Sequence, residues 1–433
     1  MSLEFKYYKI NDIGEVVSGG TPSTSKNEYW YGDIGWITPK DLSSYDDIYI
    51  SRGERNISSE GLNNSSAKLV PKNTVLMTSR APIGYIAIAN NELSTNQGFK
   101  SLICNEKICH YKYFYYWLKL NIKYIINNSN GSTFKEISGG TFKNLELSLP
   151  SLNEQKAISS VLWTIDEKIS VLKRINKNLD ELCHSLFKYY FIDFIPFCDD
   201  DFIDSDIGEI PKEWSITTVG NILDCKLGGT PSRSNESYWG GSIAWINSGK
   251  VNDFRIIEPS EYITEKGLKK SATKLLPAKT TVIAITGATL GQISLLEIDS
   301  CANQSVIGII PNINYPYEFV YPLISSILID LLKHQTGGAQ QHINKNNVES
   351  FKIICPPAEI ISEYKTIVSP IYSKISDNCF EIEKLQKLRD TLLPKLMSGE
   401  IDVSKINCDL ELKYNYMKYL FNQIHTPMSK SVV

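Results

Sequence analysis

The sequence has few features of a secreted, membrane-bound or metal-binding protein. Its nine cysteines are scattered without a C-x-x-C pair, which argues against a disulfide framework and a zinc site. No apolar run approaches the roughly 20 residues of a membrane helix. The first residues, MSLEFKYYKINDIGEVV, lack the apolar stretch of a signal peptide. We therefore expect a cytoplasmic protein in a reducing compartment, with no membrane contact.

Signatures of catalysis are also missing. The chain has no Walker-type G-x-x-x-x-G-K-[ST], no G-x-G-x-x-G and no Asn/Asp-Pro-Pro-aromatic tetrapeptide of base methylation. The five histidines show no metal-ligand spacing, and His342, in the segment GGAQQHI, is expected to make only a polar contact. We predict a protein that is not an enzyme and has no catalytic residue, bound metal or cofactor of its own.

The overall charge does not by itself indicate a nucleic-acid-binding protein. Lys and Arg number 45 and Asp and Glu 48, a net charge of −3. However, five aspartates lie within CDDDFIDSD (198–206), and without them the net charge would be +2. Because the local field rather than the total charge acts on a phosphate backbone, the composition is compatible with DNA binding.

The chain is internally repeated along most of its length. GGTPS at 19–23 returns at 228–232, and GLNNSSAKLVP at 61–71 returns as GLKKSATKLLP at 267–277. RAPIGYI (80–86) aligns with GATLGQI (287–293), and GSTFKEI (131–137) with GGAQQHI (337–343). The offset drifts only between 209 and 206, as small loop insertions produce. Short β-rich runs separated by Gly, Asn and Pro, together with helical patches, predict two α+β globules.

Each globule is followed by a long helical segment with a heptad seam. In the first copy the seam is Ile158, Leu162, Ile165, Ile169, Leu172, Asn176, Leu179, Cys183 and Leu186. In the second it is Tyr364, Val368, Ile371, Ile375, Ile382, Leu385 and Leu392. Asn176 occupies an a position, where asparagine fixes register at a cost in stability. Pro370 interrupts the second seam and is expected to kink it.

Two apolar seams of matching period are best buried against each other. Paired antiparallel, the helices would form a stiff rod with a globule at each end and an approximate two-fold axis. The alternative is two independent surface helices, each packed on its own globule.

The order of these motifs resembles the specificity subunit of type I restriction–modification enzymes. The resemblance rests on GGTPS, LPSLNEQKAI, SLFKYYFIDF and the final LRDTLLPKLMSGEI, and it covers about residues 10–401. The second helix begins PPAEIISEY instead of PSLNEQKAI, a loose match. The predicted fold class is α+β, with two pseudo-repeated α/β target recognition domains separated by two long antiparallel coiled-coil helices. The expected parts are 1–150 and 198–357 (recognition domains), 151–197 (central helix), 358–400 (distal helix) and 401–433 (C-terminal tail).

The resemblance implies a DNA-reading subunit without catalysis. Each domain would read half of a bipartite, asymmetric sequence in double-stranded DNA. The helices would measure the unread gap and dock two modification (methyltransferase) subunits, and restriction (motor and nuclease) subunits would join later. S-adenosylmethionine, ATP and magnesium would belong to those partners.

Polar residues on loops are the candidate DNA contacts, because Lys, Arg and hydroxyls bind phosphates while Arg, Lys, Asn and Gln read bases. In the first domain these are Lys40, Arg52, Arg55, Ser79, Arg80, Lys100, Thr133 and Lys135. In the second they are Lys250, Arg255, Lys269, Lys270, Thr289, Gln340 and Gln341. The GGTPS segments are interpreted as scaffold rather than as phosphate-binding loops.

Three other functions remain open at this stage. The first is the specificity subunit of a fused nuclease–methyltransferase, which would share the fold. The second is a scaffold that grips protein partners and has no affinity for DNA. The third is a self-contained enzyme, for which no motif was found.

Overall fold

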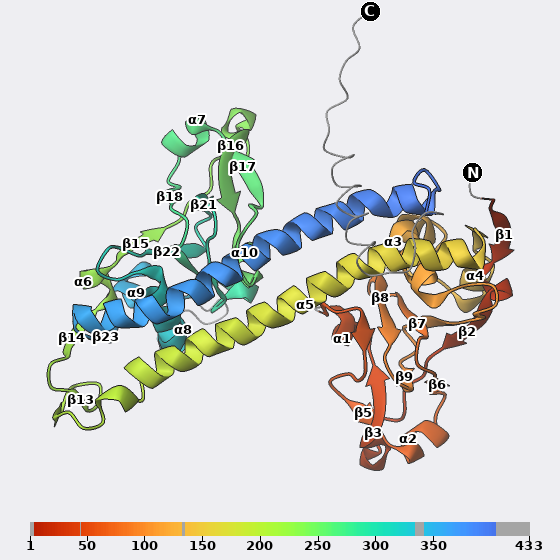
Figure 1. Cartoon of the computed structure of the whole chain (residues 1–433), viewed down its shortest axis with the longest axis horizontal. Helices are drawn as coiled ribbons and strands as arrows, with labels where there is room; N and C mark the ends of the chain where they lie inside the picture. The colour runs from red at the N-terminus through yellow and green to blue at the C-terminus, as the bar shows by residue number, and fades with distance from the viewer. Residues whose placement is uncertain (1–3, 44, 132–134, 334–341, 404–433) are drawn as a thin grey trace, which may run out of the picture. The chain divides into compact units, whose positions relative to one another are not determined.

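A computed structural model describes residues 4–43, 45–131, 135–333 and 342–403. The chain divides into two compact units: unit 1 holds Met1–Ser170 and Lys384–Val433, and unit 2 holds Val171–Glu383. Figure 1 shows the labelled helices and strands of the chain. In the described part of the chain, no helix is both long and apolar enough to cross a membrane.

Unit 1 contains two main β-sheets and a covering helix. One sheet has the strand order β2(Gly14–Ser18), β10(Lys100–Cys104), β7(Val75–Ser79), β8(Ile83–Ala89), β4(Tyr49–Ile50). The other has the order β5(Asn56–Ile57), β3(Trp30–Ile37), β9(Leu93–Thr95), β6(Leu69–Val70). Helix α3 (Tyr111–Asn127) packs on β8 and β7, and the short helices are α1(Pro39–Ser43), α2(Ser59–Asn63) and α4(Gly139–Lys143). β1(Lys6–Lys9) pairs with β11(Glu146–Leu149).

Unit 2 repeats this order, except that a single bridge between Ile256 and Leu296 takes the place of β4. Its first sheet is β15(Asp224–Leu227), β22(Val306–Ile310), β19(Thr281–Ala284), β20(Ile293–Leu295), and its second is β17(Glu261–Ile263), β16(Trp239–Ile246), β21(Ser300–Ala302), β18(Leu275–Leu276). β14(Ser215–Thr218) pairs with β23(Lys352–Cys355), and the helices are α6(Val219–Ile222), α7(Glu265–Lys269), α8(Tyr317–Lys333) and α9(Lys345–Glu349). A hairpin of β12(Phe202–Ile203) and β13(Ile210–Pro211) precedes them. The duplication predicted from the sequence is confirmed.

The GGTPS segments pack as scaffold in both copies. The indole of Trp36 donates a hydrogen bond to the carbonyl of Gly20 (2.9 Å), and that of Trp245 donates to Gly229 (3.1 Å). A Cβ atom on Gly20 would lie 2.3 Å from backbone of the neighbouring 66–67 segment, so no side chain fits there. This close approach explains why the motif needs glycine and why the tryptophan recurs at the same spacing.

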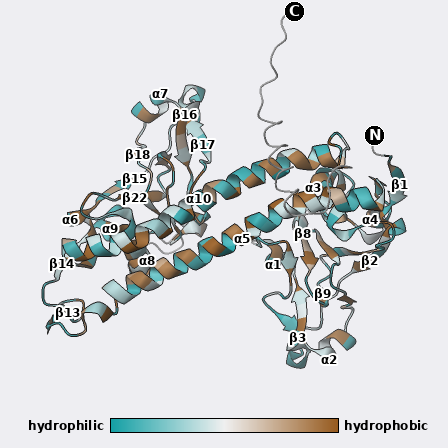
Figure 2. Cartoon of the chain, in the orientation of Figure 1, coloured by the Kyte–Doolittle hydropathy of each residue, from teal (hydrophilic) through white to brown (hydrophobic). Residues whose placement is uncertain are grey.

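Two 40-residue helices complete the chain, α5(Leu152–Phe191) and α10(Ala358–Met397). Each is about 60 Å long at 1.5 Å per residue. Hydrophobic and hydrophilic residues alternate along both (Figure 2), as the heptad pattern predicts. Pro370 does not end the second helix, because α10 runs through it.

The two helices contact each other in both units, and the contacts in unit 2 show their direction. In unit 1, Arg389 of α10 donates to Asp166 of α5 at 2.8 Å. In unit 2, the Asn378 amide donates to the Asn176 side-chain oxygen at 2.8 Å, and Asn176 is 2% exposed. Within unit 2, the Tyr364 hydroxyl of α10 donates to the carbonyl of Cys183 of α5 at 3.4 Å. The partner number on α10 thus falls from 378 to 364 as the number on α5 rises from 176 to 183, so the pair is antiparallel. The alternative of two independent helices is wrong.

The buried stripe of α5 leaves the predicted seam near its end. Cys183 is buried as predicted, but burial then passes to Phe187 and Phe191, while Leu186 is only partly covered. Both phenylalanines contact Phe319 of α8, with ring centroids 5.8 and 5.1 Å apart. The helix therefore turns its aromatic face toward the second domain, where larger side chains bury more area than Leu186 would.

Candidate nucleic-acid interface

Two loops predicted to contact DNA lie side by side in the first domain. The backbone of Arg80, just after β7, bridges that of Glu136. The amide of Ile137 donates to the carbonyl of Ser79 at 3.0 Å. The turn at 80–84 and the segment ending at 137 therefore form one surface, although about 50 residues separate them in the sequence.

The second domain forms the same surface from its own loops. The backbone of Thr286 bridges that of His342, and the amide of Ile343 donates to the carbonyl of Ile285 at 3.1 Å. Positive φ angles occur at Gly84 (107°) and Gly291 (82°), which close the two turns. The two bridges show that Thr286 in the second domain occupies the position of Arg80 in the first. The alignment of the repeats had matched Arg80 to Gly287, one position further on.

The chemistry of the first surface is charged. Arg80 Nη1 lies 3.5 Å from Glu136 Oε2, and their side chains are 41% and 44% exposed. Lys135 is exposed next to them. Beneath them, the Lys100 ammonium donates to the carbonyl of Phe99 at 3.2 Å. Burial lowers the pKa of Lys100, and the charge of Arg80 lowers it further, while Glu136 acts in the opposite direction.

The second surface is less charged. The Thr289 hydroxyl donates to the carbonyl of Thr286 at 3.3 Å, which orients the turn. His342 is exposed. Ile307 of β22, at the register position of Lys100, is fully buried. The same backbone thus carries an ion pair in one domain and a hydroxyl and an imidazole in the other.

Most of the other predicted contacts are exposed, and several are paired with acids. Lys40 lies 2.8 Å from Glu54, Lys250 lies 2.7 Å from Asp253, and Lys269 lies 3.5 Å from Glu265. Arg55 stacks on the ring of Trp30, with its guanidinium carbon 3.8 Å from the ring centroid. Arg52 and Lys270 are exposed. These side chains lie at the surface, where phosphates are accessible.

Three predicted contacts are buried, and we leave them out of the interface. Ser79 is fully buried in β7, and Lys100 is 7% exposed. The side chain of Arg255 is 0% exposed and lies 2.7 Å from Asp180 of α5; it also donates to the hydroxyl of Tyr321. A cation enclosed in this way holds the domain to the helix, and it cannot reach a DNA backbone from this position. Thr133, Gln340 and Gln341 lie outside the described residues.

Sequence reasoning missed two residues of this surface chemistry. Glu136 was not predicted, because a carboxylate repels the DNA backbone and its ion pair with Arg80 is not visible in the sequence. Arg233 lies 2.6 Å from Glu261 and stacks on Trp239 with its guanidinium carbon 3.7 Å from the ring centroid. Its stacking matches that of Arg55 on Trp30, although the two arginines come from different loops, so no sequence alignment of the repeats pairs them.

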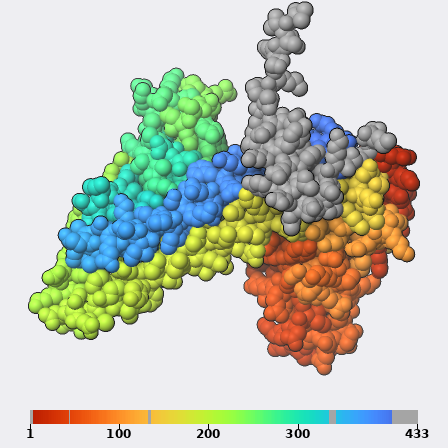
Figure 3. All heavy atoms as spheres, viewed as in Figure 1, coloured from red at the N-terminus to blue at the C-terminus, as the bar shows by residue number. Residues whose placement is uncertain are grey.

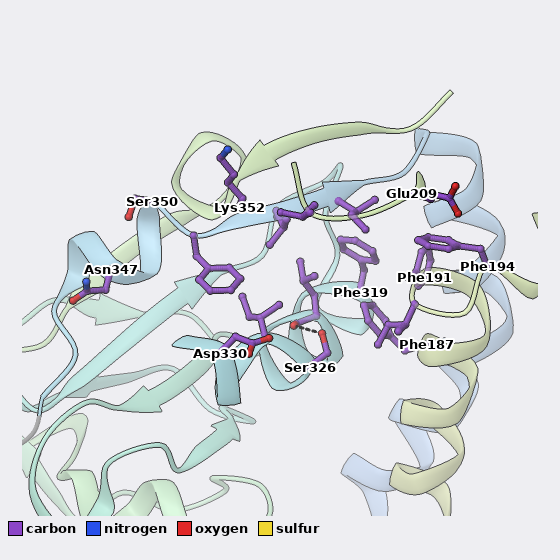
Figure 4. A pocket seen from close by; sticks show the side chains of 17 residues that line it. Phe187, Phe191, Phe194, Glu209, Phe319, Ser326, Asp330, Asn347, Ser350 and Lys352 are labelled. Carbon is purple, nitrogen blue, oxygen red and sulfur yellow. Dashed lines mark hydrogen bonds between the residues drawn. The ribbon is translucent and has the colours of Figure 1, made fainter. Parts of the chain in front are cut away.

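Unit 2 also contains an apolar pocket of about 740 Å³ (Figure 4). Phe187, Phe191 and Phe319 are among the residues that line it, as are Glu209, Asp330 and Lys352. Within the described residues, no group of three or more His, Cys, Asp and Glu side chains is placed to hold a metal ion.

The geometry defines the class of protein: an internally duplicated chain with two domains of the same fold and two long helices that pair with each other. Comparison with known proteins agrees. The type I restriction modification DNA specificity domain matches residues 3–181 and 211–390. The chain is 37% identical over 404 residues to the type I restriction enzyme MjaIX specificity subunit of Methanocaldococcus jannaschii, covering 92% of this chain and 94% of that one.

Two further similarities point the same way. The HindI specificity subunit of Haemophilus influenzae is 25% identical, over 64% of this chain and 73% of its own. The crystal structure of the S subunit of a type I system from M. genitalium has the same fold, with a TM-score of 0.57 and 18% identity, covering 91% of this chain and 96% of that one. The chain belongs to the family of type I restriction–modification DNA specificity subunits, whose part in the enzyme is recognition of DNA and not catalysis.

Proposed function

We propose that the chain reads a bipartite, asymmetric target in double-stranded DNA, with one half-site bound by each domain. The observation that supports this most directly is the pair of equivalent surfaces, Arg80 with Glu136 and Thr286 with His342. Equivalent backbones approach DNA alike, while different side chains select different bases. A target with two unlike halves follows.

The antiparallel helix pair is proposed to set the gap between the half-sites. Half-sites one helical turn apart are about 34–36 Å from centre to centre, and each helix is about 60 Å long. The buried Asn176–Asn378 contact in unit 2 and the Asp166–Arg389 contact in unit 1 tie the register of the pair. A change in register or length should therefore change the gap.

The exposed face of α5 is proposed to dock the modification subunits. Val171, Ile175 and Leu182 are 42%, 39% and 45% exposed. They follow one another at helical spacing, so they form one apolar stripe along α5. Figure 3 shows atoms of α5, in lime, at the surface of unit 2. Two modification subunits and the restriction subunits would bring S-adenosylmethionine, ATP and magnesium, and the assembly would act in the cytoplasm on chromosomal or invading DNA.

Methylome sequencing of the host, with and without this gene, tests the proposal. The expected result is one methylated motif that depends on the gene and consists of two different half-sites around a fixed gap. A gene-dependent motif that is continuous, or two identical halves, would contradict it. The purified chain alone should show no ATPase, methylation or cleavage activity.

A further inference from the structure

The ion pair of Arg80 and Glu136 has a chemical character that its counterpart in the second domain lacks. Glu136 is held from two sides, because its backbone exchanges hydrogen bonds with Asn130 (2.9 and 3.0 Å) and bridges Arg80. Arg80 and Glu136 remain 41% and 44% exposed. The backbone of this pair is thus held in place while its side chains remain accessible to solvent. Side chains that contact base edges need both properties.

An arginine beside a carboxylate complements the edge of a G·C pair in the major groove. Guanine presents two acceptors, N7 and O6, and cytosine presents the N4 donor. Guanidinium N–H groups match the two acceptors, and a carboxylate oxygen accepts from N4. An A·T pair presents an acceptor, a donor, an acceptor and a methyl group, which this arrangement does not match.

A phosphate clamp fits the same residues less well. The Glu136 carboxylate lies 3.5 Å from the Arg80 guanidinium, so a phosphate bound to Arg80 would meet a like charge. Lys100 is buried beneath the pair and donates to the carbonyl of Phe99, so it is not placed to bind a phosphate in place of Arg80. The balance favours a neutral base edge over a phosphate as the partner of Arg80.

We propose that Arg80 and Glu136 together read one G·C base pair in the half-site bound by the first domain. Glu136 has two roles in this account: it positions the guanidinium for guanine and accepts from cytosine N4. Thr286 and His342 occupy the same place in the second domain and read that half-site without an ion pair. The inference rests on the proposed function, since it assumes that each domain binds one half-site.

The test uses the full chain assembled with its modification subunits and a set of DNA duplexes that vary each base pair of both half-sites. A chimera in which residues 1–150 come from a relative first identifies the half-site of the first domain. Arg80→Ala is expected to reduce discrimination by about 10- to 100-fold at a single G·C position of that half-site. Glu136→Gln, which keeps the shape but loses the charge, should relax the same position more weakly. Lys135→Ala is the matched control, and it should weaken binding to all sequences alike.

Three results would overturn the inference. One is that Arg80→Ala weakens binding equally for every base, as loss of a phosphate contact would. Another is that base preference is unchanged while the thermal stability of the chain falls, as expected of a structural ion pair. The third is a first half-site without any G·C pair. None of these results would contradict the proposed function as long as the unaltered protein prefers two different half-sites. If the unaltered protein shows no preference for either half-site, the proposed function itself fails.

Discussion

The two domains share their scaffold closely and differ at the surfaces proposed to read DNA. Thr21 donates to Gln97 in the first domain and Thr230 donates to Gln304 in the second. The paired tryptophans repeat as well, with ring centroids 5.0 Å apart for Trp30 and Trp36. The loops that follow β7 and β19, by contrast, keep the backbone bridge and change the side chains. The contrast shows which contacts the fold requires and which positions remain available for selecting DNA sequence.

Truncating the scaffold tryptophan should produce the largest effect, and a similar one in either domain. Trp36→Ala and Trp245→Ala each remove a buried ring and its hydrogen bond to a GGTPS carbonyl. We expect each to cost about 3–5 kcal/mol in the free energy of unfolding. Denaturant unfolding followed by tryptophan fluorescence, with hydrogen exchange to locate the change, would measure it. A loss below about 1 kcal/mol at either position would show that the GGTPS contact is not scaffold.

Arg255→Met should separate a structural arginine from a reading arginine. The change leaves Asp180 as a partly buried charge without its cation, and we expect a loss of about 3 kcal/mol. Base preference in either half-site should stay as it was, in contrast to Arg80→Ala. Thermal unfolding and binding to DNA duplexes are the two measurements. If the variant loses its base preference at a position of the second half-site, Arg255 contacts DNA after all.

Acid should destabilise the first domain more than the second because of His110. Burial, with help from nearby Lys112 and Lys156, lowers the pKa of His110 from 6.5 to about 4, and the equivalent position before α8 is Pro316. Between pH 6.5 and pH 4, His110 is therefore protonated in the unfolded chain but neutral in the folded domain. The free energy of unfolding of the first domain falls as the pH drops through this range. Partial exposure limits the loss to about 2 kcal/mol or less.

Hydrogen exchange at pH 7 and pH 5 would resolve the two domains. His110→Gln should flatten the pH dependence of the first domain and leave the second unchanged. If the two domains lose protection equally, and the variant changes neither, the buried imidazole is not the cause.

Much of the helix pair could be predicted from the sequence, although the buried stripe leaves the predicted seam at Phe187 in α5 and at Tyr372 in α10. The surface proposed to read DNA could not be predicted in the same way. A heptad repeat is periodic and needs burial on one side only, so Asn176 could be assigned to the seam before any contact was known. Arg80 and Arg255 look alike in sequence, since each lies on a predicted loop. Only the fold shows that one is open beside Glu136 and that the other is enclosed beside Asp180.

The second limit is the loop register. Alignment of the repeats paired Arg80 with Gly287, and the backbone bridges pair it with Thr286 instead. A one-residue insertion in a turn leaves little trace in sequence, because turns accept many residue types. In a strand the same shift would move every side chain to the opposite face, which is why the β-rich segments aligned reliably.

The most direct test of the account is a matched heptad insertion in the two helices, between Ile169 and Leu172 of α5 and at the paired level of α10. Seven residues add about 10 Å to the pair, which is about three base pairs of duplex. Methylome sequencing should then find the same two half-sites with a gap longer by about three base pairs. An unchanged gap in a variant that still folds and methylates would contradict the account, because the helix pair would then not set the distance between the halves of the target.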